Sequence, residues 1–249
     1  MNSVIETILN HRSIRKFEEK LLTDEQIKVL VESAQAASTS SYIQAYSIIG
    51  VKDKEKKKQL AELAGNQSYV AENGHFFVFC ADLYRHQLIS ELHDKPSQPV
   101  LESTEKYMVA VIDATLAAQN AVLAAESMGL GAVYIGGLRN QLQEVSNILK
   151  TPKYVLPLFG VAVGYPAQKP DKKQRLPLEH VYHEDEYEQD KNVYIDQLKD
   201  YDDFISAYYH KRTGGQRSDT WTGQMADLLS RPARMYMKEF IEDKGFNKK

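Results

Sequence analysis

Residues 102–128 read ESTEKYMVAVIDATLAAQNAVLAAESM, a long helical pattern that is apolar on almost every side. A helix without a polar face must be buried on several sides. Gly129 and Gly131 follow it, and glycine is the residue that ends a helix in a left-handed cap at least cost. The stretch therefore predicts a buried helix that other elements cover. Its small residues, which would let another helix approach closely, are Ala117, Ala118, Ala121, Ala124 and Ala125.

The apolar runs outside this helix are short and predict strands. Phe76–Ala81 is compact and apolar throughout, which is typical of a strand buried on both faces. Helical patterns separate the strands, and Thr23–Gln26 has the form of a capping box that opens one of them. Few strands between long helices predict an α+β or α/β layered fold around a central sheet. The other predicted strands are Tyr46–Val51, Ala132–Ile135 and Leu156–Val163.

The length and composition predict one main domain. A chain of 249 residues with 43% hydrophobic residues can bury one substantial core. We therefore expect a single domain over residues 1–249, with an excursion at about 82–100, where charged residues and two prolines mix. A polar, tyrosine-rich helical region is expected from about residue 190.

Composition also excludes several classes of protein. A net charge of −3 argues against a nucleic-acid-binding protein, which usually carries an excess of positive charge. Residues 1–17 lack the pattern of a secretory signal, and we expect no window that approaches the roughly 20 apolar residues of a membrane helix. Cys80, the single cysteine, lies in an apolar run and is predicted to be a buried, inert thiol. These features predict a cytoplasmic protein.

The common catalytic motifs do not occur in the sequence. Gly129-Leu130-Gly131 precedes a predicted strand and lacks a third glycine, so it is not a dinucleotide fingerprint. His180–Glu184 could hold a metal, but histidines in a loop rich in tyrosine and glutamate are more often solvated. Ser38–Ser41 has no evident partner base for a nucleophilic serine. Cationic and glycine-rich segments remain, and these are typical of an enzyme whose cofactor carries the chemistry.

Six segments, taken in order, carry a resemblance that covers essentially the whole chain. The sequence resembles the oxygen-insensitive, FMN-dependent NADPH nitroreductase and FMN reductase family, in its larger, NADPH-preferring group. The resemblance implies an α+β, three-layer sandwich with a central, mostly antiparallel sheet flanked by helices. It also implies an interlocked homodimer with the helix of residues 102–128 in its interior. The segments are His11–Arg15, Ala37–Ser41, Gly65–Tyr69, Tyr134–Arg139, Pro170–Pro177 and Arg212–Trp221.

By this resemblance, the segments form an FMN site. The flavin phosphate is a dianion, and each charge-assisted hydrogen bond to it stabilises binding by roughly 1.5–3 kcal/mol. Tyr134–Gly137 would lie against the isoalloxazine ring with a backbone N–H near its N5, Gln67 would bond the pyrimidine edge, and Tyr69 and Arg139 belong to the same matching segments. Thr39, Ser40 and Ser41 would reach the FMN of the other subunit, with threonine where serine is common in the family. The phosphate end would be held by His11, Arg12, Ser13, Arg15, Lys173 and Arg175.

Two arginines flank a glycine-containing segment near the end of the chain and predict the NADPH site. NADPH differs from NADH by one phosphate, and the planar fork of arginine suits phosphate oxygens. Arg212 and Arg217 surround Thr213–Gln216, which is flexible enough to close over a nucleotide. The alternative to an NADPH site here is a disordered basic loop. For the cations assigned to the FMN phosphate, the alternative is ordinary surface charge.

The resemblance implies a two-step reaction. NADPH delivers hydride to flavin N5, NADP⁺ leaves, and a small acceptor such as a nitroaromatic, a quinone or free flavin takes two electrons at the same face. The flavin carries the hydride, so no protein residue is expected to be an obligatory proton donor. Two alternatives remain: a flavin reductase or carrier that supplies reduced FMN to a partner enzyme, and a non-catalytic FMN-binding module.

Overall fold

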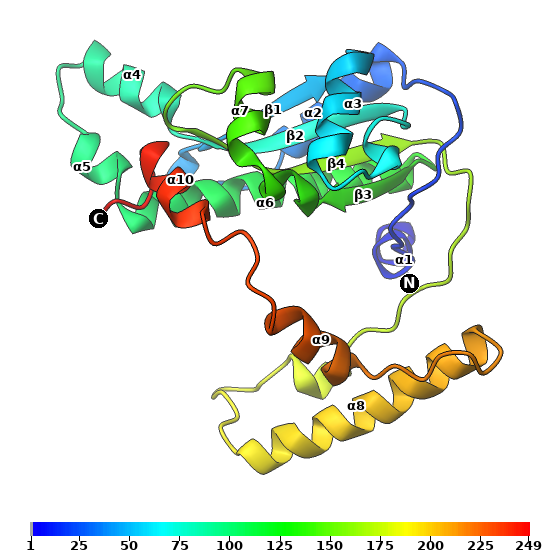
Figure 1. Ribbon diagram of the computed structural model, residues 1–249. Helices are drawn as coiled ribbons and strands as arrows, with labels where there is room; N and C mark the ends of the chain where they lie inside the picture. Colours follow the sequence, from blue (N-terminus) through cyan, green and yellow to red (C-terminus); the bar gives the residue numbers. More distant parts are fainter. Residues whose placement is uncertain (1) are drawn as a thin grey trace. The chain divides into compact units, whose positions relative to one another are not determined.

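The computed structural model describes residues 2–249 of the chain (Figure 1). Its contacts divide the chain into two compact units. The first unit comprises the chain up to Lys172 together with Arg234–Lys249, and the second comprises Lys173–Ala233. The single domain expected over residues 1–249 stays a prediction.

The first unit is built on a four-stranded antiparallel sheet. Its strand order is β1-β2-β4-β3, and β2 pairs with both β1 and β4. The predicted strands are confirmed to within one residue at each end, and every residue of β2 is buried. The strands are β1 (Tyr46–Val51), β2 (His75–Asp82), β3 (Gly131–Ile135) and β4 (Val155–Gly164).

Helices cover both faces of the sheet, as the alternation of side chains along β2 requires. Phe77 and Phe79 point into a cluster with α2 (Asp24–Gln35) and α6 (Thr104–Ser127). Phe76, Val78 and Cys80 point to the opposite face, where α3 (Lys54–Leu63) and α7 (Leu142–Leu149) close the core. The result is the predicted three-layer α+β sandwich, with α6 under the sheet and α3 and α7 above it in Figure 1.

Helix α6 lies where the sequence predicts a buried helix. Ser103 caps its first turn by accepting a hydrogen bond from the Lys106 N–H at 3.2 Å, and Gly129 follows its end with a φ of +75°. One face of α6 packs on the sheet and on α2, whereas Met108, Ile112 and Leu116 on another face are exposed in the single chain. The helix is therefore covered on fewer sides than its composition indicates.

The expectation that no segment approaches a membrane helix was wrong. Within residues 2–249, one helix, α6, is long and apolar enough to cross a membrane by length and composition. Half of its apolar window is nevertheless buried inside the protein. A core helix that packs against a sheet needs the same apolar composition, so length and composition cannot separate the two cases.

The capping box that opens α2 is confirmed. In the charged helix α3, one lysine is buried. Thr23 Oγ1 accepts from the Gln26 N–H at 3.2 Å, and the Gln26 side chain accepts from the Thr23 N–H at 3.0 Å. The charged residues 54–59 form the first part of α3. Lys57, however, is only 5% exposed, and its ammonium group donates to the Asn73 carbonyl at 3.2 Å. One lysine of this highly charged helix is therefore buried in the core.

The remaining elements of the first unit are short helices. Residues 82–100, predicted as an excursion, form α4 and α5, which extend away from the sheet in Figure 1. The end of the chain returns to the core, where Phe240, Ile241 and Phe246 are buried with Leu142 and Tyr154. These helices are α1 (Ser3–Leu9), α4 (Tyr84–Leu92), α5 (Gln98–Leu101) and α10 (Met237–Asp243).

The second unit is mainly a pair of helices, α8 (Lys191–Arg212) and α9 (Trp221–Leu229). The Tyr201 and Trp221 rings meet edge to face at 5.8 Å between centroids. His183 packs against the ring of Tyr187, 4.7 Å away. No cluster of metal-ligating side chains occurs among residues 2–249, so the alternative of a metal near His180–Glu184 finds no support.

His75 gives the fold a testable pH dependence. Its side chain is buried at the start of β2, and within residues 2–249 its Nε2 has no hydrogen-bond partner. Burial, with the charges of Lys52 and Lys57, lowers the pKa of His75 to about 4, whereas Asp24 opposes the shift. In the unfolded chain His75 is protonated below about pH 6.5, whereas in the folded chain it stays neutral down to about pH 4. The free energy of unfolding therefore falls as the pH drops from 6.5 to 4.

We predict that His75→Gln removes this part of the acid sensitivity. Between pH 7 and pH 4.5 the wild type should lose about 2–3 kcal/mol more unfolding free energy than the variant. Denaturant titrations of both proteins at the two pH values measure the difference. Parallel losses in the two proteins would show that His75 does not resist protonation.

Candidate functional site

The segment His11–Arg15 lies along the edge of the sheet. The Ile14 N–H donates to the Ala132 carbonyl of β3 at 3.0 Å, and the Ile14 side chain is buried. A Cβ at Gly131 would lie 2.6 Å from Ile14 Cγ1, so the absence of a side chain there permits this close approach. The contact places the basic segment beside the strand that leads to Tyr134–Arg139.

The polar side chains of this segment are partly engaged with the protein. His11 Nδ1 and Glu126 Oε1 are 2.6 Å apart. Arg12 Nε donates to the Asn10 carbonyl at 3.2 Å, and among residues 2–249 its terminal nitrogens have no hydrogen-bond partner. Ser13 is half-buried, and Arg15 is exposed with no ion-pair partner among residues 2–249. Hydrogen-bond donors therefore remain available around Arg12 and Arg15.

Gln67 and Gly137 are far apart in the sequence, and the fold brings them together. A Cβ at Gly137 would lie 2.3 Å from the Ala64 carbonyl oxygen and 2.8 Å from Gln67 Nε2. Gln67 Nε2 donates to the same Ala64 carbonyl at 2.9 Å. Tyr69 follows Gln67 and packs against the core cluster that contains Ile135. The structure thus assembles the Gln67–Tyr69 and Ile135–Gly137 segments at one place.

Tyr134 stands at the exposed side of β3, next to buried Ile135. Its hydroxyl donates to Gln119 Oε1 at 3.1 Å, and its ring meets the Phe159 ring edge to face at 5.5 Å. Burial, followed by the negative charge of Glu126, raises the pKa of Tyr134 to about 12. The phenol is therefore neutral at physiological pH.

Arg139 belongs to the short 3₁₀ segment Gly136–Asn140. Its Nη1 donates to the Leu158 carbonyl of β4 at 2.8 Å, and a Cβ at Gly136 would lie 2.9 Å from its Nη2. Burial, followed by the charge of Arg234, lowers the pKa of Arg139. In this structure the guanidinium joins the 3₁₀ segment to the sheet.

Thr39, Ser40 and Ser41 belong to a loop with unusual backbone geometry. Ser41, Tyr42 and Gln44 have φ values of 48°, 58° and 53°. None of them is a glycine, so each left-handed residue costs roughly 1–2 kcal/mol. Within residues 2–249, no hydrogen bond joins residues 39–41 to residues 11–15, 67–69 or 134–139. Hydrogen bonds within residues 2–249 therefore do not connect this loop to the other predicted flavin contacts.

The second unit contains Lys173 and Arg175 at the rim of a pocket of about 460 Å³. Both side chains are exposed, and aromatic rings make up much of the lining. The pocket therefore combines two cations with flat apolar surfaces. The aromatic residues are Tyr201, Tyr208, Tyr209 and Trp221.

Arg212 and Arg217 lie at the end of α8 and in the turn that follows. Arg212 Nη1 donates to the Tyr208 hydroxyl at 3.2 Å. Arg217 Nε donates to Asp219 Oδ2 at 2.6 Å, and its guanidinium lies 4.7 Å from the centroid of the Tyr209 ring. Both arginines are solvent-exposed, so their present contacts leave them accessible to a phosphate.

A larger pocket of the first unit contains few of the predicted residues. It has a volume of about 870 Å³ and lies between α1 and residues 166–169. Arg12 and Ile14 line it, whereas no residue of 67–69 or 134–139 does. Lys169, which the sequence analysis did not single out, adds a second cation to its wall. Pocket size alone would therefore not have identified the segments that the fold assembles.

Comparison with known families assigns the chain to a class. The nitroreductase family matches residues 8–165, and the C-terminal domain of the nitroreductase family matches residues 173–249. The first match alone covers more than half of the chain. The protein belongs to the nitroreductase family.

Individual relatives extend the similarity over the full length. An FMN reductase (NADPH) of Bacillus subtilis is 57% identical over 248 residues, which are 100% of both chains. The structure of NfrA1 of B. megaterium is 68% identical, with a TM-score of 0.98 over 99% of this chain and 100% of that one. The structure of the NADPH:FMN oxidoreductase of Vibrio harveyi, complexed with NAD⁺, is 40% identical, with a TM-score of 0.89 and full coverage of both chains.

We predict that Gly137→Ala disturbs the contact between Gly137 and Gln67. The added methyl would meet the Ala64 carbonyl and the Gln67 amide, and such overpacking costs about 1–3 kcal/mol of unfolding free energy. The loss should be smaller in a Gln67→Ala background, because one of the two obstructing groups is gone. Denaturant titration of the four proteins measures the coupling. Strictly additive effects would show that the two residues do not touch.

Proposed function

We propose that the protein is an FMN-dependent oxidoreductase that uses NADPH to reduce nitroaromatics, quinones or free flavin by two-electron transfer. The observation that carries this proposal is the full-length match to an FMN reductase (NADPH) at 57% identity. The similarity to an NADPH:FMN oxidoreductase structure over the whole chain supports it. We assign the two segments that lie together in the fold, Gln67–Tyr69 and Ile135–Gly137, to the binding of FMN.

The phosphate of FMN fits the donors at the edge of the sheet. It is a dianion, and the free nitrogens of Arg12, the Ser13 hydroxyl and the guanidinium of Arg15 are the kind of donors that it needs. His11 is held by Glu126 and would present its other ring nitrogen. On the sequence resemblance we also assign Lys173 and Arg175 to the phosphate. Each charge-assisted bond would stabilise binding by roughly 1.5–3 kcal/mol.

The flavin ring fits the segments around Gly136 and Gly137. A glycine has no Cβ to keep a flat ring from the backbone, and the Gln67 amide can bond the polar edge of a ring. When bound, FMN supplies the two-electron chemistry. Tyr134 remains a neutral hydrogen-bond donor to Gln119, because its pKa is about 12. We assign Tyr69, Ile135 and Arg139 to the support of this surface.

We further propose that the protein acts as a cytoplasmic homodimer. Met108, Ile112 and Leu116 follow one another at helical spacing on α6 and are 54%, 50% and 45% exposed in the single chain. A contiguous apolar face of this kind fits a second copy of the chain. In the dimer, Thr39–Ser41 would complete the flavin site of the neighbouring subunit. Helix α1 contributes further exposed apolar side chains, Val4, Ile5, Ile8 and Leu9.

We predict that the purified protein is yellow and releases FMN on denaturation. One terminal phosphate suits the donor set around Arg12 and Arg15. Chromatography of the released flavin identifies it, and NADPH added without oxygen should bleach the flavin absorbance. Release of FAD would contradict the cofactor, and flavin that NADPH does not bleach would favour a non-catalytic FMN-binding module.

We also predict that Arg217→Ala weakens the use of NADPH selectively. Loss of a charge-assisted bond to the 2′-phosphate should raise the KM for NADPH roughly ten- to a hundredfold. The kcat should change little, because the contact is made equally in the ground state and the transition state. Steady-state kinetics with both nucleotides measures this effect.

NADH kinetics are the control for this variant, since NADH lacks the 2′-phosphate. Its KM should stay within about twofold of the wild-type value, because no charge-assisted bond is lost. Arg212→Ala should act in the same direction as Arg217→Ala. Equal losses with NADPH and NADH would show that these arginines do not read the 2′-phosphate.

A further inference from the structure

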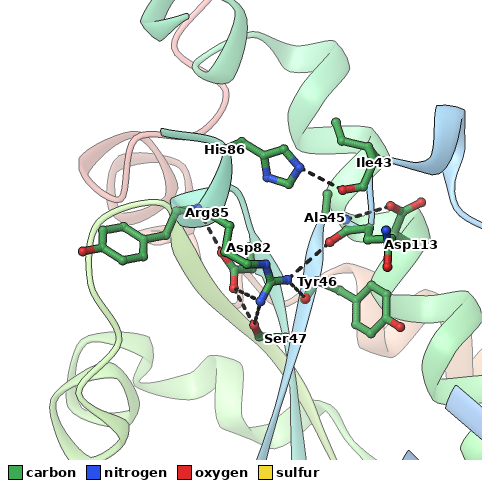
Figure 2. Close-up of polar contacts among 10 residues, drawn as sticks. Ile43, Ala45, Tyr46, Ser47, Asp82, Arg85, His86 and Asp113 are labelled. Atoms are coloured by element: carbon green, nitrogen blue, oxygen red, sulfur yellow. Dashed lines mark hydrogen bonds and ion pairs between the residues drawn. The ribbon is translucent and has the colours of Figure 1, made fainter. Parts of the chain in front are cut away.

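Asp113 is a fully buried acid in the apolar middle of helix α6, and it binds both ends of the loop that contains Thr39–Ser41. Its Oδ1 accepts from the Ser40 N–H at 3.1 Å, and its Oδ2 accepts from the Ala45 N–H at 3.0 Å. Figure 2 shows the carboxylate beside Ala45, at the start of the strand that follows the loop. One side chain thus fixes the distance between the two ends of residues 40–45.

Two side chains from the first turn of α4 hold the same loop by its carbonyl groups. His86 Nε2 donates to the Ile43 carbonyl at 2.8 Å (Figure 2). Arg85 Nη2 donates to the Tyr46 carbonyl at 2.5 Å and to the Gln44 carbonyl at 3.4 Å. The N–H groups are therefore bound by a carboxylate, and the carbonyls by an imidazole and a guanidinium. We call Asp113, Arg85 and His86 the loop clamp.

The sheet in turn positions the arginine of the clamp. Asp82, the last residue of β2, lies 3.5 Å from Arg85 Nη1 and accepts from the Tyr84 N–H at 2.9 Å. The Ser47 hydroxyl donates to Asp82 and accepts from Arg85 Nη1 at 3.1 Å (Figure 2). The excursion that starts after β2 thus has a structural task, because its first turn faces the loop.

The backbone of the loop requires such a clamp. Ser41, Tyr42 and Gln44 adopt left-handed conformations, and such residues keep this geometry only where the surroundings over-determine it. Asp113 has no ion-pair partner within residues 2–249, so backbone N–H groups are its compensation for burial. An apolar residue at position 113 would avoid the cost of burying a charge, but it would leave both N–H groups without an acceptor.

We propose that Asp113 is a positioning residue of the flavin site. With Arg85 and His86, it holds Thr39–Ser41 in the shape in which this segment reaches the FMN of the neighbouring subunit. The inference rests on the proposed function, because that function assigns Thr39–Ser41 to the cofactor. Asp113 itself acts only through the backbone of the loop.

The variant Asp113→Asn tests this role with the least change of volume. An amide keeps one oxygen acceptor, and its NH₂ group would face a backbone N–H, so one bond becomes a donor–donor contact. In flavin-free protein, deuterium uptake over residues 39–46 should be faster than in the wild type. The dissociation constant for FMN should rise about tenfold or more, by analogy with the loss of affinity when the residues that support a metal ligand are changed. With FMN at saturation, kcat should return to near the wild-type value.

Val122→Ala is the matched control on the same helix. Val122 is buried in the core, nine residues beyond Asp113, about 13 Å along the helix. The change leaves a cavity and lowers stability without altering an acceptor of the loop. It should leave deuterium uptake over residues 39–46 and the FMN dissociation constant near the wild-type values, measured well below the melting temperatures.

Arg85→Ala tests the same loop from the exposed side, should Asp113→Asn fail to fold. It should raise both the loop exchange and the FMN dissociation constant, by less than Asp113→Asn. Faster exchange with unchanged FMN binding, in either variant, would overturn the proposal while the wild type still binds FMN. Unchanged exchange would overturn it as well. A wild type that binds no FMN would instead overturn the proposed function on which the inference rests.

Discussion

The alanine face of α6 packs directly against the antiparallel sheet, and the arrangement of the first unit depends on this contact. The helix contributes small side chains such as Ala117 and Ala118, and the sheet contributes the rings of Phe77 and Phe79. Phe79 also stacks on the Phe159 ring at 5.8 Å. Because the large groups come from one layer and the small groups from the other, a change in either alters a volume that a close-packed interior cannot absorb.

The same helix has two further tasks, which explain its unusual composition. Its exposed apolar side chains, of which Ile112 is one, would make a single chain prone to associate, and the proposed dimer covers them. Asp113 lies next to Ile112 in the sequence, but its buried carboxylate accepts hydrogen bonds from two N–H groups of the loop. A helix that serves a core, a subunit interface and a loop cannot show the simple polar and apolar halves of an ordinary surface helix.

Local patterns in the sequence were sufficient for most of the fold. Short apolar runs located all four strands, and the spacing of Thr23 and Gln26 identified a helix start, because both signals depend on residues that are close together in the sequence. The burial of Lys57 and His75 could not be predicted, because it results from segments that are distant in the sequence. The acid Asp113 in the middle of an apolar stretch was a signal of the loop clamp, but its partners Ser40 and Ala45 are distant in the sequence and meet it only in the folded chain.

In the candidate site, too, the sequence alone could not show which glycines serve the packing of the protein and which serve a ligand. Two glycines near the site have demands within the protein itself. Gly137, which the resemblance assigns to the flavin, admits the Ala64 carbonyl and the Gln67 amide, and Gly131, which follows α6, admits Ile14. The nearest atoms to a Cβ at Gly136 belong to the flexible end of Arg139, which can move away. Packing alone therefore accounts for glycine at positions 131 and 137, but it makes a weaker case at position 136. A ligand that needs the bare backbone is thus best sought at Gly136.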